Sequence, residues 1–123
     1  MRVSNFKLLA AASALALLFA PPAFAHARLL SSSPANNASV EAAPATVVLT
    51  FNERLVPAFT KAELTMPGHG GMKIAASSAP SPDGKSLIVT PARPLAKGTY
   101  KVVWNTASAD GHKMSGEISF TVR

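Results

Sequence analysis

Several segments of this chain alternate apolar and polar side chains, and this pattern constrains the fold more than any other feature. A period of two residues is that of a β-strand, because successive side chains of a strand point to opposite faces. No segment after residue 25 shows a helical period. The clearest strand candidates are residues 46–51, 100–106 and 117–123, and weaker candidates are residues 28–32, 62–66, 72–75 and 86–90.

Turn-forming residues separate these candidate strands. They occur at residues 33–37, 67–68, 82–84, 96–98 and 110–111. About seven short strands at such spacing are typical of a two-layer antiparallel fold. We therefore predict one all-β domain, a two-sheet sandwich or a Greek-key barrel. Trp104 shares a strand face with Tyr100 and Val102 and is predicted to lie in the core, whereas the Ala/Pro/Ser-rich residues 75–82 are predicted to form a mobile loop.

The first residues have the composition of a secretory leader. Arg2 and Lys7 precede an apolar run over residues 8–20, which is shorter than the ~20 residues of a membrane-spanning helix. Ala23-Phe24-Ala25 then provides the small residues that signal peptidase favours. We predict a cleaved signal peptide at residues 1–25 and an exported domain at residues 26–123 without stable membrane insertion.

Composition excludes several classes of function. The chain has a net charge of +6, but its basic residues are scattered singly and do not alternate with aromatic residues. Nucleic-acid binding therefore has little support. The chain also has no cysteine, which excludes disulfides, thiol nucleophiles, blue-copper sites and thiolate-bound zinc.

Cleavage after Ala25 would make His26 the first residue, whose α-amine and imidazole can chelate one metal ion. Asp110 and His112 are two residues apart, so their side chains leave an extended segment on the same side. Together these groups would form a set of three nitrogens and one oxygen, which suits Cu(II). The alternatives are that His26 is an incidental first residue and that Asp110-Gly111 is a plain hairpin turn followed by an exposed His112.

The chain resembles the CopC family of periplasmic copper-binding proteins over essentially all of residues 26–123. The N-terminal histidine and the late Asp-x-His are the most specific part of this resemblance. The segments that carry it are His26-Ala27-Arg28-Leu29, Ser32–Ala35, Leu49-Thr50-Phe51-Asn52-Glu53, Pro94-Leu95, Gly98–Val102, Trp104 and Ser108–His112.

The resemblance implies an immunoglobulin-like Greek-key β-barrel that binds Cu(II) at one end. It also implies a periplasmic role in copper resistance or delivery, beside an inner-membrane partner of the CopD type. His26, Asp110 and His112 would be the copper ligands, and Glu53 matches a family glutamate near the metal. Glu53 also continues the core-facing alternation of residues 47–51. Either the strand ends at Asn52, or the carboxylate of Glu53 needs a cation or a hydrogen-bond donor.

A second copper site is an open alternative. Some family members hold Cu(I) in a methionine-rich loop, because the ion prefers soft thioether ligands. This chain has Met66, His69 and Met72 in a glycine-rich segment, with fewer sulfur atoms than that pattern. These residues either form a three-coordinate Cu(I) site or are incidental to a flexible turn.

The function that fits these features best is a copper carrier or buffer rather than an enzyme. One alternative is a small copper-dependent monooxygenase that uses the same N-terminal histidine. A single tryptophan and a single tyrosine leave little surface for a polysaccharide substrate, and Asp110 would occupy space that oxygen activation needs. The other alternative is a structural immunoglobulin-like module without metal.

Overall fold

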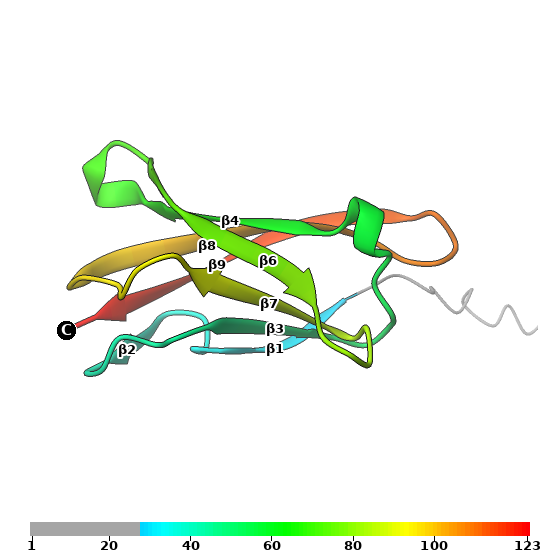
Figure 1. Cartoon of the computed structure of the whole chain (residues 1–123), viewed down its shortest axis with the longest axis horizontal. Helices are drawn as coiled ribbons and strands as arrows, with labels where there is room; N and C mark the ends of the chain where they lie inside the picture. The colour runs from blue at the N-terminus through cyan, green and yellow to red at the C-terminus, as the bar shows by residue number, and fades with distance from the viewer. Residues whose placement is uncertain (1–27) are drawn as a thin grey trace, which may run out of the picture.

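The computed structural model describes residues 28–123, so the predicted signal peptide and His26 lie outside the described residues. The described chain is almost entirely β-structure (Figure 1). Its strands are β1 (Leu29–Ser33), β2 (Ala38–Val40), β3 (Val47–Phe51), β4 (Lys61–Met66), β5 (Met72–Ile74), β6 (Ala76–Pro80), β7 (Ser86–Pro91), β8 (Gly98–Ala107) and β9 (Lys113–Val122). Two short 3-10 turns, η1 (Pro57–Phe59) and η2 (Pro67–His69), flank β4.

The strands form two sheets that pack face to face. One sheet has the order β1-β3-β7-β6 and the other has the order β2-β9-β8-β4-β5. All pairings are antiparallel except that of β2 with β9. The sheets stay open rather than closing into a barrel, so the predicted all-β, immunoglobulin-like fold is confirmed in its sandwich form.

The prediction of a loop at residues 75–82 is wrong, because residues 76–80 form strand β6. This strand pairs with β7 from Ala76 opposite Pro91 to Pro80 opposite Leu87. It lies at a sheet edge, where only one side of the backbone is paired and small polar side chains face solvent. Such a strand is held by backbone hydrogen bonds and lacks the apolar alternation from which the other strands were predicted.

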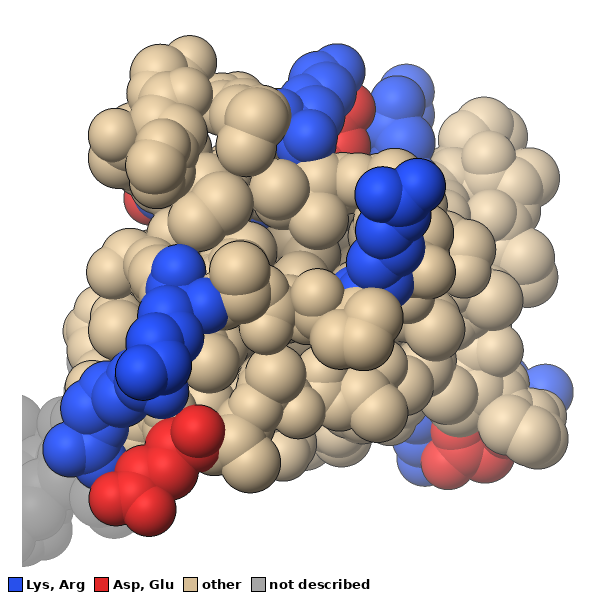
Figure 2. All heavy atoms as spheres, turned by 60° about the vertical axis from the view of Figure 1, so that its left-hand side comes forward, with Lys and Arg blue, Asp and Glu red and all other residues tan. Residues whose placement is uncertain are grey.

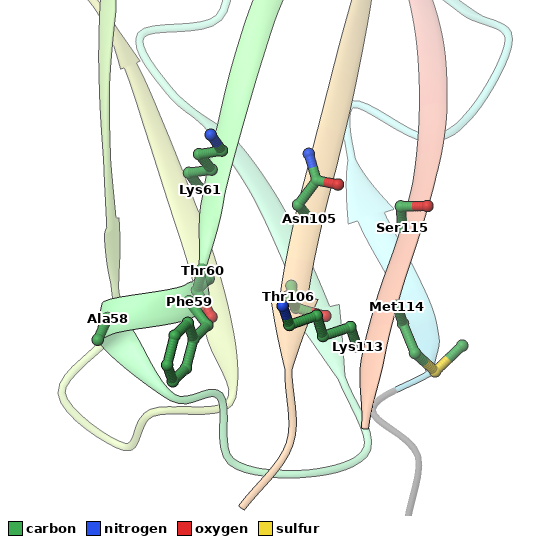
Figure 3. A pocket seen from close by; sticks show the side chains of 9 residues that line it. All are labelled: Ala58, Phe59, Thr60, Lys61, Asn105, Thr106, Lys113, Met114 and Ser115. Carbon is green, nitrogen blue, oxygen red and sulfur yellow. The ribbon is translucent and has the colours of Figure 1, made fainter. Parts of the chain in front are cut away.

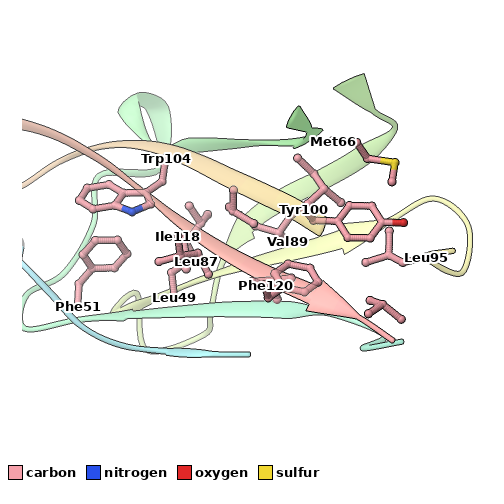
Figure 4. Packing of buried hydrophobic residues seen from close by; sticks show 14 of the residues in the cluster. Leu49, Phe51, Met66, Leu87, Val89, Leu95, Tyr100, Trp104, Ile118 and Phe120 are labelled. Atoms are coloured by element: carbon pink, nitrogen blue, oxygen red, sulfur yellow. The ribbon is translucent and has the colours of Figure 1, made fainter. Parts of the chain in front are cut away.

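Alternate side chains of the long strands fill the space between the sheets (Figure 4). Trp104 is only 5% exposed, which confirms its predicted place in the core. Its ring meets that of Phe51 edge to face, with centroids 5.1 Å apart. Tyr100 stacks on Phe120 toward the other end and donates its hydroxyl proton to the carbonyl of Ala96 at 2.7 Å.

Strands β8 and β9 form a ten-residue hairpin whose register runs from Gly98 opposite Val122 to Ala107 opposite Lys113. The connection between them, residues 108–112, lies at one end of the sandwich (Figure 1). The start of β1 lies at the same end, whereas η2 lies at the opposite end. The fold therefore brings the Asp110–His112 loop and the first described residues to one end.

Figure 2 shows how the charged side chains are distributed over one face of the molecule, with a band of Lys and Arg side chains beside Asp and Glu side chains. Lys and Arg side chains lie there in separate groups with uncharged surface between them. Within residues 28–123, no helix is long and apolar enough to cross a membrane.

Gly116 lies opposite Trp104 in the hairpin, and a β-carbon there would come within 2.4 Å of the indole ring. Because the indole is packed against Phe51, it cannot move away freely. We expect Gly116→Ala to lower the free energy of unfolding by about 1–3 kcal/mol, as overpacking of a core does. Urea unfolding measures this change. A matched control is Gly68→Ala, where a β-carbon meets nothing within 4 Å. Equal stability of the two variants would contradict the expectation.

Candidate metal centre

The loop between β8 and β9 is a tight turn closed by its own backbone. The Gly111 N–H donates to the carbonyl of Ser108 at 2.9 Å, and the Ser108 N–H donates to the carbonyl of His112 at 3.1 Å. Gly111 has a φ of 88°, a left-handed conformation that glycine adopts without steric cost. Asp110-Gly111 is thus a hairpin turn, and its closure fixes the positions of the residues on either side.

Asp110 and His112, which were predicted to lie on the same side, are in direct contact. His112 Nδ1 lies 2.7 Å from Asp110 Oδ2, and the backbone N–H of His112 donates to Oδ1 at 3.1 Å. A carboxylate that hydrogen-bonds one ring nitrogen orients the imidazole for metal binding through the other nitrogen. The pair therefore has the arrangement of a histidine ligand with its supporting carboxylate.

Ser108 completes this arrangement and was not singled out from the sequence. Its side chain is buried, and its hydroxyl donates a hydrogen bond to Asp110 Oδ1. The hydrogen bond from Ser108, then those from the ring and backbone N–H of His112, lower the pKa of Asp110 well below the ordinary value. The carboxylate therefore stays ionised at neutral pH. The Ser-x-Asp-x-His spacing is the sequence signal that points to this role.

The start of the described chain is attached beside this loop. The Arg28 N–H donates to Asn52 Oδ1 at 2.6 Å, and the Arg28 carbonyl accepts from the Asn52 N–H at 3.1 Å. Leu29 then pairs with Phe51 at the end of β3. Arg28 is thereby fixed at the end of the sandwich that carries Asp110 and His112. His26, the central residue of the predicted site, lies outside the described residues.

Glu53 follows β3, which ends at Phe51, so the core-facing alternation does not extend to it. The half-buried Glu53 makes no ion pair within residues 28–123. Two residues further on, Leu55 forms an isolated bridge with Ser108, and the Val56 N–H donates to the carbonyl of Ala107 at 2.9 Å. The segment containing Glu53 thus leads directly to the Asp110–His112 loop.

The described residues do not form a complete metal site. Within residues 28–123, no group of three or more His, Cys, Asp or Glu side chains is arranged to hold a metal ion. Asp110 and His112 are brought together, and Glu53 is not clustered with them. The arrangement presents one oriented imidazole with an ionised carboxylate in contact with it, and the two cannot bind the same metal ion while the Nδ1–Oδ2 contact remains.

The candidate Cu(I) residues lie at the opposite end of the sandwich, around η2 (Figure 1). Met66 is 7% exposed and belongs to the core, where its methyl group would lie 2.7 Å from a β-carbon at Gly98. Met72, its partner across the β4–β5 hairpin, is 50% exposed. A Cu(I) site formed by Met66, His69 and Met72 stays a prediction, in which Met66 would contribute from a largely buried position.

Comparisons with known proteins agree with this architecture. Residues 29–123 match the model of the CopC domain. The chain is 51% identical to copper resistance protein C of Xanthomonas campestris pv. juglandis over 113 residues, 88% of each chain. It is 42% identical to copper resistance protein C of Pseudomonas syringae pv. tomato over 112 residues, 87% of this chain and 88% of that protein.

Solved structures give the same result. PcoC, a methionine-rich copper resistance protein from Escherichia coli, superposes with a TM-score of 0.74 at 42% identity and covers 80% of this chain and 100% of its own. CopC from Methylosinus trichosporium OB3b superposes with a TM-score of 0.69 at 29% identity and covers 79% and 93%. The fold and the matched sequence define a copper resistance protein of the β-sandwich class. The chain belongs to the CopC family, which confirms the resemblance.

The lowered pKa of Asp110 predicts how the stability of the metal-free protein depends on pH. A carboxylate whose pKa is lower in the folded state stabilises the fold above its unfolded-state pKa of about 3.9, and this contribution is lost as the pH falls toward the folded-state pKa. We expect Asp110→Asn to lower the thermal midpoint at pH 7. The difference from the wild type should shrink between pH 4 and pH 2. Thermal unfolding by circular dichroism without metal tests this, and a pH-independent difference would contradict it.

Proposed function

We propose that this protein binds Cu(II) in the bacterial periplasm and serves copper resistance, buffering or delivery without catalytic turnover. The signal peptide would be removed after Ala25, and His26 would bind copper through its α-amine and imidazole. Asp110 and His112 would complete the site. The observation that carries the proposal is the Asp110–His112 pair, held at the same end of the sandwich to which Arg28 is fixed.

Chain length supports a contribution from His26. Two residues of extended chain span at most about 7 Å, which limits the distance between the Cα atoms of Arg28 and His26. Arg28 is hydrogen-bonded to Asn52 at the end of the sandwich that carries Asp110 and His112. A first residue only two positions before Arg28 would therefore be close to that end. No large rearrangement of the sandwich is needed for the groups to meet.

The chemistry of these donors favours Cu(II). Amine and imidazole nitrogens with a carboxylate oxygen form a tetragonal set, and cupric ion binds such sets more tightly than the other common divalent ions do. The ionised Asp110 offsets part of the metal's charge. We also place Glu53 beside the copper, where its carboxylate would offset more of the metal's charge. The segment that follows Glu53 pairs with the start of the Asp110–His112 loop, since Leu55 forms a bridge with Ser108.

Copper-handling relatives favour a carrier over the alternatives. The two relatives described above are named copper resistance proteins, so a structural module without metal fits the family poorly. A copper-dependent monooxygenase that uses the same N-terminal histidine is the remaining alternative, and it would show oxygen-dependent turnover. A CopD-type inner-membrane protein is the partner that we expect to exchange copper with this one.

The proposed chelate of His26 is tested by separating the α-amine of the chain from the His26 imidazole. A mature protein with one extra residue before His26 loses the amine–imidazole ring, because the amine then belongs to another residue. We expect Cu(II) affinity to fall by at least about 100-fold, more than the loss of an orienting group alone causes. Competition with a chromophoric chelator measures the affinity, and mass spectrometry confirms the first residue. The control carries the same extra residue at the C-terminus. Unchanged affinity would remove His26 from the site.

The location of the Cu(II) site is tested with matched histidine variants. His112→Ala removes a proposed ligand, whereas His69→Ala changes the turn at the other end of the sandwich. We expect His112→Ala to weaken Cu(II) binding by at least about 100-fold, more than the loss of an orienting group causes, and His69→Ala to leave it within about twofold. The same competition titration reports both values. The reverse order would place the Cu(II) site in the methionine-containing turn.

A further inference from the structure

A hollow of about 430 Å³ lies on the outer face of the five-stranded sheet, at the end that carries the Asp110–His112 loop (Figure 3). Its floor is a row of side chains across three strands, since Lys61 pairs with Asn105 and Asn105 pairs with Ser115. Phe59 of η1 and Lys113 of β9 border it. We refer to this hollow as the η1 groove.

Phe59 gives the η1 groove an exposed apolar surface. Its side chain is 60% exposed, whereas the aromatic residues of the core are buried. The Lys113 Nζ lies 6.0 Å from the centre of the Phe59 ring, at the limit of a cation–π interaction. The groove thus combines an accessible aromatic ring with a cation beside it.

The positive charge of the η1 groove is not balanced within the described residues. On the same outer face, Lys73 pairs with Glu63 at 3.4 Å and Lys101 pairs with Glu117 at 3.5 Å. Lys61 and Lys113 form no ion pair with any carboxylate of residues 28–123. None of the side chains that line the groove is acidic. Four lysines lie on the strands of this sheet, and the two of them with no carboxylate partner within residues 28–123, Lys61 and Lys113, are the two that border the hollow.

This combination matches a particular kind of partner. Complementary charges at the rim of an interface guide association and select the partner, and a large apolar side chain at its centre contributes affinity. Carboxylates are the groups that two unbalanced lysines attract. The basic residues are scattered singly along the chain, which argues against a nucleic-acid backbone as the occupant.

We propose that the η1 groove docks an acidic segment of the protein that exchanges copper with this one. Carboxylates of that segment contact Lys61 and Lys113, and an apolar side chain packs on Phe59. Lys113 directly follows His112, so a partner in the groove lies beside the candidate copper ligands. The inference rests on the proposed function, because it identifies the surface through which copper would be handed over.

The test uses the mature apo protein and a defined probe, a capped peptide of four acidic residues around a central phenylalanine. Amide chemical shifts measured by NMR during titration locate the contact and give Kd. We expect shifts confined to residues 58–61, 105 and 113–115. Lys61→Ala and Lys113→Ala should each weaken binding by about threefold to fivefold, the range for an exposed ion pair. Phe59→Ser should weaken binding as well.

Lys101→Ala is the matched control, because it removes a lysine from the same strand face outside the groove. It should leave Kd within about twofold, because Lys101 does not line the groove and is paired with Glu117. A peptide with glutamine and asparagine in place of the acids should cause no shifts in the groove. Equal weakening by Lys101→Ala, or shifts spread over the basic surface, would overturn the proposal. Equal binding of the neutral peptide would overturn it too.

The copper site and the groove can fail independently. Cu(II) affinity of the Phe59→Ser and Lys61→Ala proteins should equal that of the wild type, because neither residue belongs to the proposed copper site. Tight Cu(II) binding without peptide docking overturns the groove alone. Peptide docking in the groove without specific Cu(II) binding overturns the proposed function, and the groove then remains as a docking surface for an acidic partner.

Discussion

The ten-residue register between β8 and β9 decides where the candidate copper ligands lie. Trp104 packs across the hairpin against Gly116 and, edge to face, against Phe51 of the other sheet. A slip of one residue would move the indole to the outer face and change the length of the connecting loop. The packing of this indole therefore fixes the Ser108–His112 turn and, through β3, the attachment of Arg28 at the same end.

Much of this arrangement can be predicted from the sequence, because a strand buried on one face alternates apolar and polar residues. Residues 46–51, 100–106 and 117–123 alternate clearly and overlap β3, β8 and β9. Strand β6 could not be predicted in this way. It lies at a sheet edge, where backbone hydrogen bonds hold it and its side chains need not be apolar. The three-residue β2 is too short to show a period.

The candidate site was predictable only where its residues are neighbours in the chain. The spacing of Asp110 and His112 predicts that they share a side, and the structure shows them in contact. Ser108 shows the same spacing from Asp110, but its role depends on burial that the bridge with Leu55 provides. For Glu53 the sequence leaves two alternatives open, and the structure shows the first, a strand that ends before it. The pairing of residues 55 and 56 with residues 108 and 107, which holds the chain after the strand, is tertiary and has no local pattern.

The contact between Asp110 and His112 also limits how both residues can bind one copper ion. The two imidazole nitrogens lie on opposite sides of the ring, so an ion bound to Nε2 is remote from the oxygen that contacts Nδ1. Direct ligation by both side chains therefore requires the ring to turn and the Nδ1–Oδ2 hydrogen bond to break. The bonds from Ser108 and the His112 backbone to Oδ1 do not depend on the ring. If both residues bind copper as proposed, the carboxylate would keep its place through these bonds while the imidazole turned, and the loop would supply a fixed oxygen ligand and a reoriented nitrogen ligand.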